Sequence, residues 1–299
     1  MVAVLETEGL TRRFGRLLAV DDLNLRVDEG DIYGFLGLNG AGKTTSIRMC
    51  LNLIRPTAGR VRVFGQDLGS SFISIMSRVG ALVELPAYYP HLSARVNLEL
   101  LRLLTPGIER ARIDEVLDLV GLGERKDGAV RTFSQGMRQR LGIAMALLPR
   151  PRLVILDEPA NGLDPQGIAD IRSVLRDLNR KEGVTMLISS HLLHEVEVTC
   201  TRVGILKAGR LVEQESVEAI LAKAGTTVRI EASPAGRVLE IVRSLPWVQG
   251  AESGGDGAVT VRVAPERRAE LNAELVKAGV AVTAFVPERM SLENYFLSR

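Results

Sequence analysis

The sequence predicts an α/β protein in two parts: a large domain built on a parallel sheet over residues 1–222, and a small α+β domain over residues 223–299. The chain has 299 residues, and a typical domain has about 150. From Leu153 onwards, short apolar runs typical of buried strands alternate with amphipathic helical stretches, which favours a parallel sheet. After about Gly225 a second set of strand and helix patterns begins, and it indicates a separate folding unit.

Residues 3–84 are expected to form mainly strands, because short β-rich runs alternate with Gly and Asp turns. These runs are VAVLE, LAVDDLNLRV, IYGFLG, RVRVFG and VGALVE, with one helix opening at Gly42. Residues 93–148 then change to helical spacing, carried by Leu98, Leu101, Leu104, Ile113, Val116, Leu117 and Val120. We therefore expect a helical insertion within the first domain.

Beyond this insertion the strands LVILD, MLISS and VGILK are expected, with a helix whose apolar face carries Ile168, Ile171, Leu175 and Leu178. The C-terminal domain shows TVRIEA, a helix near Val238 to Leu245, a Gly-rich turn at Gly254 to Gly257, VTVRV, a helix near Glu270 to Ala278, and VAVTAFV. Trp247 is expected in its core, and PERR at 265–268 is expected to begin a solvated helix. The domain carries no constellation of catalytic residues, so a dimer-stabilising or regulatory role is favoured over ligand sensing.

The composition predicts a folded, soluble chain and excludes several classes. Apolar residues make up 46% and charged residues 25%, which is usual for a globular protein. A net charge of +2 does not favour nucleic acid as the main partner. Cys50 and Cys200 lack the spacing of a zinc site and are expected to be reduced and partly buried. No apolar run reaches the ~20 residues that cross a bilayer, and Glu6 and Glu8 interrupt any secretory signal, so we expect a cytoplasmic chain.

A phosphate-binding loop is predicted between an apolar strand that ends at Leu36 and the helix that opens at Gly42. The segment GLNGAGKTT fits G-x-x-x-x-G-K-[ST] and comprises Gly37, Leu38, Asn39, Gly40, Ala41, Gly42, Lys43, Thr44 and Thr45. Glycine permits a backbone whose N–H groups converge on phosphates, and the helix N-terminus adds positive potential there. Lys43 supplies a point charge, Thr44 a hydroxyl for Mg²⁺, and Thr45 a further phosphate contact.

Two carboxylates follow the apolar strand LVILD. Asp157 is expected to hold Mg²⁺, directly or through water, and Glu158 to accept a proton from the attacking water as general base. His191 follows the strand MLISS, where the carboxyl ends of parallel strands gather ligand-binding residues, and it is a candidate sensor of the γ-phosphate. A lone His is more often a satisfied polar residue, and the neighbouring motifs favour the functional role here.

The order of motifs resembles the ABC ATPase family over residues 3–215. The motifs are Gly37 to Thr45, TFSQGMRQR at Thr132 to Arg140, Leu153 to Glu158, NGLDP at Asn161 to Pro165, and His191. The resemblance implies a phosphate-loop core, an antiparallel β-subdomain and a helical subdomain that carries the signature motif. It also implies that ATP is bound together with Mg²⁺ and hydrolysed.

In that family the signature closes over the γ-phosphate held by the opposite protomer, which implies a homodimer. Ser134 and Gly136 match its usual LSGGQ pattern, whereas Gln135 and Met137 depart from it. The same resemblance implies that Asp164 lies in the loop that spans the dimer interface. Phe14 is implied to stack on adenine, in place of the usual Tyr.

Glu84 stands where most relatives carry a Gln that contacts Mg²⁺ and the attacking water. Together with SQGM, the C-terminal domain and the ending SLENYFL, it resembles the bacitracin, lantibiotic and daunorubicin resistance exporters. This implies a separate six-span permease, attachment to the inner face of the membrane, and a peptide-antibiotic, drug or lipid-like cargo. The alternatives are an ATPase acting on DNA or ribosomes and an importer ATPase.

The segment Leu85 to Leu92, LPAYYPHL, is predicted to dock on the permease. It directly follows Glu84, and two adjacent Tyr between two Pro cannot both enter one core, so at least one is expected at an interface. The alternative is that one Tyr packs on the helical subdomain while the other is merely solvated.

Overall fold

The structure is a computed structural model that describes residues 2–224, 226–254, 257–289 and 291–297. The chain forms two compact units, Met1–Ser216 and Val217–Arg299. The division expected after residue 222 falls inside helix α8 (Val217–Ala224), which belongs to the second unit.

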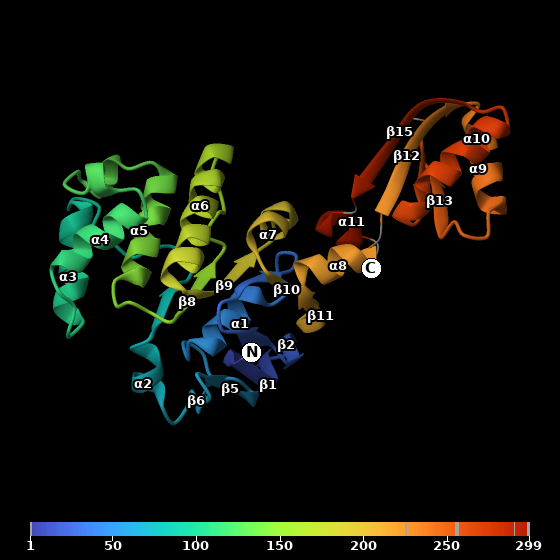
Figure 1. Cartoon of the computed structure of the whole chain (residues 1–299). Coiled ribbons are helices and arrows are strands. Elements are labelled where there is room, and N and C mark those ends of the chain that lie inside the picture. The colour runs from blue at the N-terminus through green and yellow to red at the C-terminus, as the bar shows by residue number, and fades with distance from the viewer. Residues whose placement is uncertain (1, 225, 255–256, 290, 298–299) are drawn as a thin grey trace. The chain divides into compact units, whose positions relative to one another are not determined.

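The first unit is built on a six-stranded sheet in the order β11-β10-β4-β9-β8-β7 (Figure 1). Its strands are β4 (Ile32–Leu36), β7 (Val79–Leu82), β8 (Leu153–Asp157), β9 (Thr185–Ser190), β10 (Arg202–Lys207) and β11 (Arg210–Ser216). All neighbours run parallel except β10 and β11. The carboxyl ends of β4, β9 and β8 therefore lie side by side, with Leu36 opposite Ser190 and Asp157 opposite Ser189.

An antiparallel sheet forms the second layer of this unit, in the order β2-β1-β5-β6 with β3 also paired to β1. Its strands are β1 (Ala3–Phe14), β2 (Leu17–Leu23), β3 (Arg26–Asp28), β5 (Ala58–Val63) and β6 (Gln66–Asp67). The single strand expected over LAVDDLNLRV is wrong, because the chain breaks between β2 and β3. The Thr7 hydroxyl stabilises the break: it donates to Leu23 O and accepts from Leu25 N, both at 2.8 Å.

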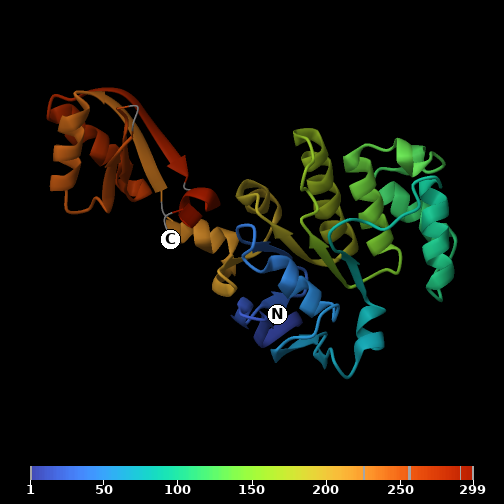
Figure 2. The same cartoon turned by 180° about the vertical axis from the view of Figure 1, so that it is seen from behind.

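The helices of the first unit are α1 (Lys43–Cys50), α2 (Phe72–Met76), α3 (Ala94–Leu104), α4 (Ala111–Leu119), α5 (Gln135–Leu147), α6 (Pro165–Glu182) and α7 (Leu193–Thr199). Two short 3₁₀ turns, η1 (Gly123–Arg125) and η2 (Val130–Thr132), separate α4 from α5. Helices α3, α4 and α5 form one group in both views, apart from the antiparallel strands (Figures 1 and 2). The helical insertion is confirmed, although Leu104, expected on its buried face, is 81% exposed because α3 ends there.

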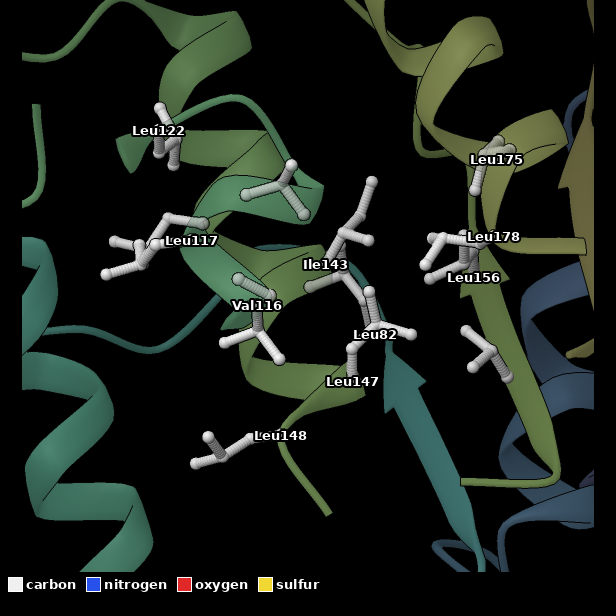
Figure 3. Packing of buried hydrophobic residues seen from close by; sticks show 14 of the residues in the cluster. Leu82, Val116, Leu117, Leu122, Ile143, Leu147, Leu148, Leu156, Leu175 and Leu178 are labelled. Carbon is white, nitrogen blue, oxygen red and sulfur yellow. The ribbon is translucent and has the colours of Figure 1, made fainter. Parts of the chain in front are cut away.

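Two apolar cores hold the layers of the first unit together. One lies among α4, α5, α6 and the strands β7 and β8, where Leu82 and Ile143 lie between Leu117 of α4 and Leu156 of β8 (Figure 3). The other lies between the antiparallel sheet, α1 and the parallel sheet, and includes Phe35 and Cys50. Burial raises the pKa of the Cys50 and Cys200 thiols to about 12, and neither is in a disulfide, as the sequence predicts.

The second unit is a four-stranded antiparallel sheet in the order β13-β14-β12-β15. Its elements after α8 are β12 (Thr226–Ser233), α9 (Ala235–Ser244), β13 (Gly250–Ser253), β14 (Val259–Arg262), η3 (Pro265–Arg267), α10 (Arg268–Lys277), β15 (Ala281–Arg289) and α11 (Leu292–Leu297). Helices α9 and α10 cover one face of the sheet (Figure 2). The α+β class is confirmed, whereas β13 was not expected from the sequence.

The structure can be compared with three smaller predictions for the second unit: Trp247, the PERR run and the Gly-rich turn. Trp247 packs, partly buried, against the core, and the guanidinium of Arg267 lies 5.5 Å from its ring centre. The PERR run begins α10 through η3 and is largely exposed. The predicted turn at 254–257 includes residues 255–256, which lie outside the described residues. Across the described ranges, no helix is long and apolar enough to cross a bilayer.

Candidate active site

The segment Gly37 to Gly42 connects β4 to α1 as a tight loop. Gly42 has φ +106°, and a Cβ there would lie 2.5 Å from Ala19 O, so no other residue fits without displacing the backbone. Leu38, Asn39 and Gly40 are exposed at the tip of the loop, while Thr44 and Thr45 are half-buried in the first turn of α1. The exposed backbone of the loop therefore runs into the N-terminus of α1, and this arrangement suits an anionic ligand.

The Lys43 side chain is 6% exposed and crosses beneath the loop. Its Nζ donates to Gly37 O at 2.7 Å and to Leu38 O at 3.4 Å. It also lies 3.1 Å from Oε1 of Glu158. The ammonium is therefore held between the phosphate loop and the end of β8, where the sequence places the catalytic carboxylates.

Asp157 and Glu158 are positioned by Ser189, a residue that the sequence analysis missed. The Ser189 hydroxyl donates to Asp157 Oδ1 at 2.5 Å and accepts from the Glu158 N–H at 2.9 Å. Glu158 has φ +50°, so its side chain leaves the regular alternation of β8. Ser189 could have been noticed as a polar residue at the end of a buried strand, two positions before His191, but nothing local shows that β9 lies next to β8.

His191 and Glu158 are in direct contact. Nδ1 of His191 lies 2.6 Å from Oε2 of Glu158, and the His191 side chain is 32% exposed. Glu158 thus contacts Lys43 through one oxygen and His191 through the other. The structure brings together Lys43, Asp157, Glu158 and His191, four of the residues for which the sequence predicted a role at the phosphates or the metal.

A second group of predicted residues lines a separate hollow of about 390 Å³. Ser134 caps α5 by accepting from Met137 N at 3.2 Å, and Asp164 caps α6 by accepting from Gly167 N at 2.8 Å. Gly136 lies beside them in open space, because a Cβ added there would meet nothing closer than Gly167 Cα at 3.8 Å. Two helix N-termini therefore face one hollow, which favours an anion.

Glu84 and Phe14 lie outside both groups. Glu84 is 62% exposed, has φ +62°, and forms an ion pair with Arg48 of α1. Phe14 ends β1 with 44% of its surface exposed. The Arg48 guanidinium binds the carboxylate of Glu84 in the structure, and a role of Glu84 at the metal stays a prediction.

A glycine-rich loop at the end of β4, beside paired carboxylates at the end of β8, defines a nucleoside triphosphatase of the phosphate-loop class. Comparison with known proteins narrows this class. The family model described as "ABC transporter" matches residues 20–161. The bacitracin transport ATP-binding protein BcrA of Bacillus licheniformis is 40% identical over 99% of this chain and 97% of its own. The chain belongs to the ATP-binding subunits of ABC transporters, and it is an ATPase.

Two further comparisons agree with this assignment. The daunorubicin resistance ATP-binding protein DrrA3 of Streptomyces coeruleorubidus is 33% identical over 97% of this chain and 93% of its own. A solved dimeric ATP-binding cassette, described as a post-hydrolysis state bound to ADP and Pi, is 25% identical with a TM-score of 0.64 and covers 71% of this chain and 98% of its own. Cassettes of this family bind ATP, form dimers and work with transmembrane subunits. These relatives favour a transporter over an ATPase that acts on DNA or ribosomes.

We predict that Ser189→Ala lowers turnover about tenfold or more while ATP affinity stays within about twofold, because a hydrogen bond to a charged group contributes ~1.5–3 kcal/mol. Steady-state hydrolysis and equilibrium ATP binding measure the two effects. The matched control is Ser77→Ala, which removes a hydroxyl whose one hydrogen bond among the described residues is to Ser74 O at the surface. Normal turnover in Ser189→Ala would show that Ser189 does not position the carboxylates.

Proposed function

We propose that this chain drives export by hydrolysing ATP as a homodimer that binds a separately encoded permease on the cytoplasmic face of the membrane. The observation that carries this proposal is the similarity to BcrA over 97% of that protein, which includes the C-terminal unit as well as the cassette. By analogy with the names of BcrA and DrrA3, the cargo is a peptide antibiotic, a drug or a lipid-like molecule. An importer is the alternative, and it would share the same cassette.

The phosphate loop and Lys43 are proposed to hold the ATP phosphates. Backbone N–H groups from Gly37 to Thr45 would cradle them, and the Lys43 ammonium would bind the β- and γ-phosphate oxygens. In the structure this ammonium contacts Oε1 of Glu158 at 3.1 Å. A triphosphate carries more negative charge than one carboxylate, so it would draw Lys43 away and release Glu158 for proton transfer.

Glu158 is proposed as the general base. It would accept a proton from a water that attacks the γ-phosphorus, while the bond from phosphorus to the bridging oxygen breaks and ADP leaves. His191, which contacts Oε2 of Glu158, would orient that carboxylate and hydrogen-bond the γ-phosphate. Glu158 contacts Lys43 directly and His191 contacts Glu158, which supports a joint action on the same phosphate.

The oxygen donors near the phosphate loop fit Mg²⁺. Asp157 uses Oδ1 for Ser189, and its other carboxylate oxygen has no hydrogen bond within the described chain. Asp157 and the Thr44 hydroxyl are hard oxygen ligands of the kind that Mg²⁺ prefers. When bound, Mg²⁺ would neutralise charge on the phosphate oxygens. Glu84 is proposed to join these ligands, which requires that its carboxylate leave Arg48.

The hollow lined by Ser134, Gly136 and Asp164 is proposed to meet the γ-phosphate held by a second copy of the chain. It offers two capped helix N-termini and the open backbone of Gly136. Gln135 leaves the common signature pattern, and its Nε2 donates to Asn161 O at 3.3 Å. This contact links the signature to the loop that precedes Asp164 within one protomer.

The segment Leu85 to Leu92 is proposed to dock on the permease. Tyr88 packs against the core of the helical subdomain, while Tyr89 is 57% exposed and Leu85 is 85% exposed. Asn97, buried in α3, accepts from Tyr89 N at 2.7 Å and donates to Tyr89 O at 3.1 Å. The backbone of the segment is therefore fixed while two apolar side chains remain available to a partner.

We predict that Glu158→Gln lowers ATP hydrolysis by ~10²–10⁴, the usual contribution of a general base, and retains ATP binding. The variant should accumulate as an ATP-bound dimer, which size-exclusion chromatography with light scattering detects. Glu124→Gln, the same change at an exposed 3₁₀ turn, should behave as wild type. Turnover of Glu158→Gln near the wild-type rate would rule out Glu158 as the base.

The export proposal is tested by purifying the chain from native membranes and identifying what accompanies it. We expect a six-span membrane protein, and we expect Leu85→Ser/Tyr89→Ser to lose it while basal ATPase stays normal. Val212→Ser, an exposed apolar change on β11, is the control and should retain the partner. Retention of the permease by the double variant would contradict docking at this segment, and recovery of an importer's substrate-binding subunit would contradict export.

A further inference from the structure

The guanidinium of Arg12 lies against the ring of Phe14. Its Cζ is 4.4 Å from the ring centre, which is cation–π distance. The pairing of β1 with β2 is irregular on both sides of Arg12, and such irregularities re-aim side chains. One face of the Phe14 ring is thus covered, while the residue remains 44% exposed.

Arg12 is held in this position by few other groups. Its Nη1 donates to Arg55 O at 2.6 Å, and this is the one hydrogen bond of its guanidinium among the described residues. Its Nε is buried without a partner, and no carboxylate of the described chain forms an ion pair with it. A guanidinium that is partly desolvated and has no counter-ion gains more from an aromatic face than a hydrated one does.

We infer that Arg12 is a positioning residue for the nucleotide base, acting through Phe14 in a three-layer stack of guanidinium, phenyl ring and purine. The inference rests on the expectation, from the family resemblance, that the Phe14 ring stacks on the nucleotide base. With one ring face covered by Arg12, only the opposite face can receive a base. Arg12 also fixes the ring before the ligand arrives, which lowers the entropy cost of stacking.

A general attraction between Arg12 and the phosphates is the competing explanation, and ligand choice separates the two. Inorganic tripolyphosphate has the charges of ATP but no base. Stacking through Phe14 therefore affects ATP and GTP and leaves tripolyphosphate unchanged, whereas charge attraction affects all three. Arg13, adjacent, exposed and of equal charge, provides the matched control.

The test measures the binding of ATP, GTP and tripolyphosphate, each with Mg²⁺, to the full chain by calorimetry. We expect Arg12→Ala to weaken ATP and GTP about three- to tenfold and tripolyphosphate less than about twofold. Arg12→Lys should lose part of this affinity, because an ammonium does not lie flat on a ring. Arg13→Ala should not alter the ratio of ATP to tripolyphosphate affinity.

The double variant shows whether Arg12 acts through Phe14. In a Phe14→Ala background, Arg12→Ala should cause no further loss of ATP affinity. Equal weakening of all three ligands, or an undiminished effect in that background, would overturn the inference. So would normal ATP affinity in Arg12→Ala and Arg12→Lys while Phe14→Ala binds ATP more weakly. Normal ATP affinity in Phe14→Ala would be a different result, since it would show that Phe14 does not stack on the base.

Discussion

The buried ammonium of Lys43 is the contact on which the arrangement of the site depends. A cation that is 6% exposed is costly unless it is paired and hydrogen-bonded, and Gly37 O and Glu158 Oε1 provide both contacts. These groups come from the ends of two strands, β4 and β8, that are not neighbours in the sheet. The Lys43 and Glu158 side chains still meet, because only β9 lies between β4 and β8, and the carboxyl ends of all three strands form one edge of the sheet.

Contacts at this edge also stabilise the unusual backbone conformation of Glu158. Its left-handed conformation carries a strain of about 1–3 kcal/mol for a residue with a side chain. The hydrogen bond from its N–H to Ser189, and the contacts of its two oxygens with Lys43 and His191, offset that strain. Ser189 and His191 thereby fix the direction of the carboxylate before any ligand arrives, while Lys43 occupies Oε1 until, as proposed, a triphosphate draws the ammonium away. Asn161 N also donates to Glu158 O at 3.0 Å, so the turn toward Asp164 begins at the residue proposed as general base.

The second unit has its own apolar core and is closed by the last helix of the chain. Its core is formed by Val228, Ile230 and Val259 on the sheet and by Val238 and Leu271 on the helices. The chain then returns, and α11 packs against α8, the helix that opens the unit. The ending SLENYFL is therefore part of the unit's own structure, with Leu292 and Tyr295 buried. A dimer-stabilising or regulatory role for this unit remains a prediction.

The sequence by itself determined the features that depend on a few adjacent residues. Two examples are Gly42 and Lys43 at the start of a helix, and the apolar run before Asp157, which is typical of a buried strand. The tertiary structure alone decided the contacts between segments far apart in the chain. Ser189 binds Asp157 and Glu158, the proposed metal ligand and general base, and Arg48 binds Glu84. The order of strands and the packing of α1 set these contacts, and residue spacing along one segment carries no information about which segment lies next to it.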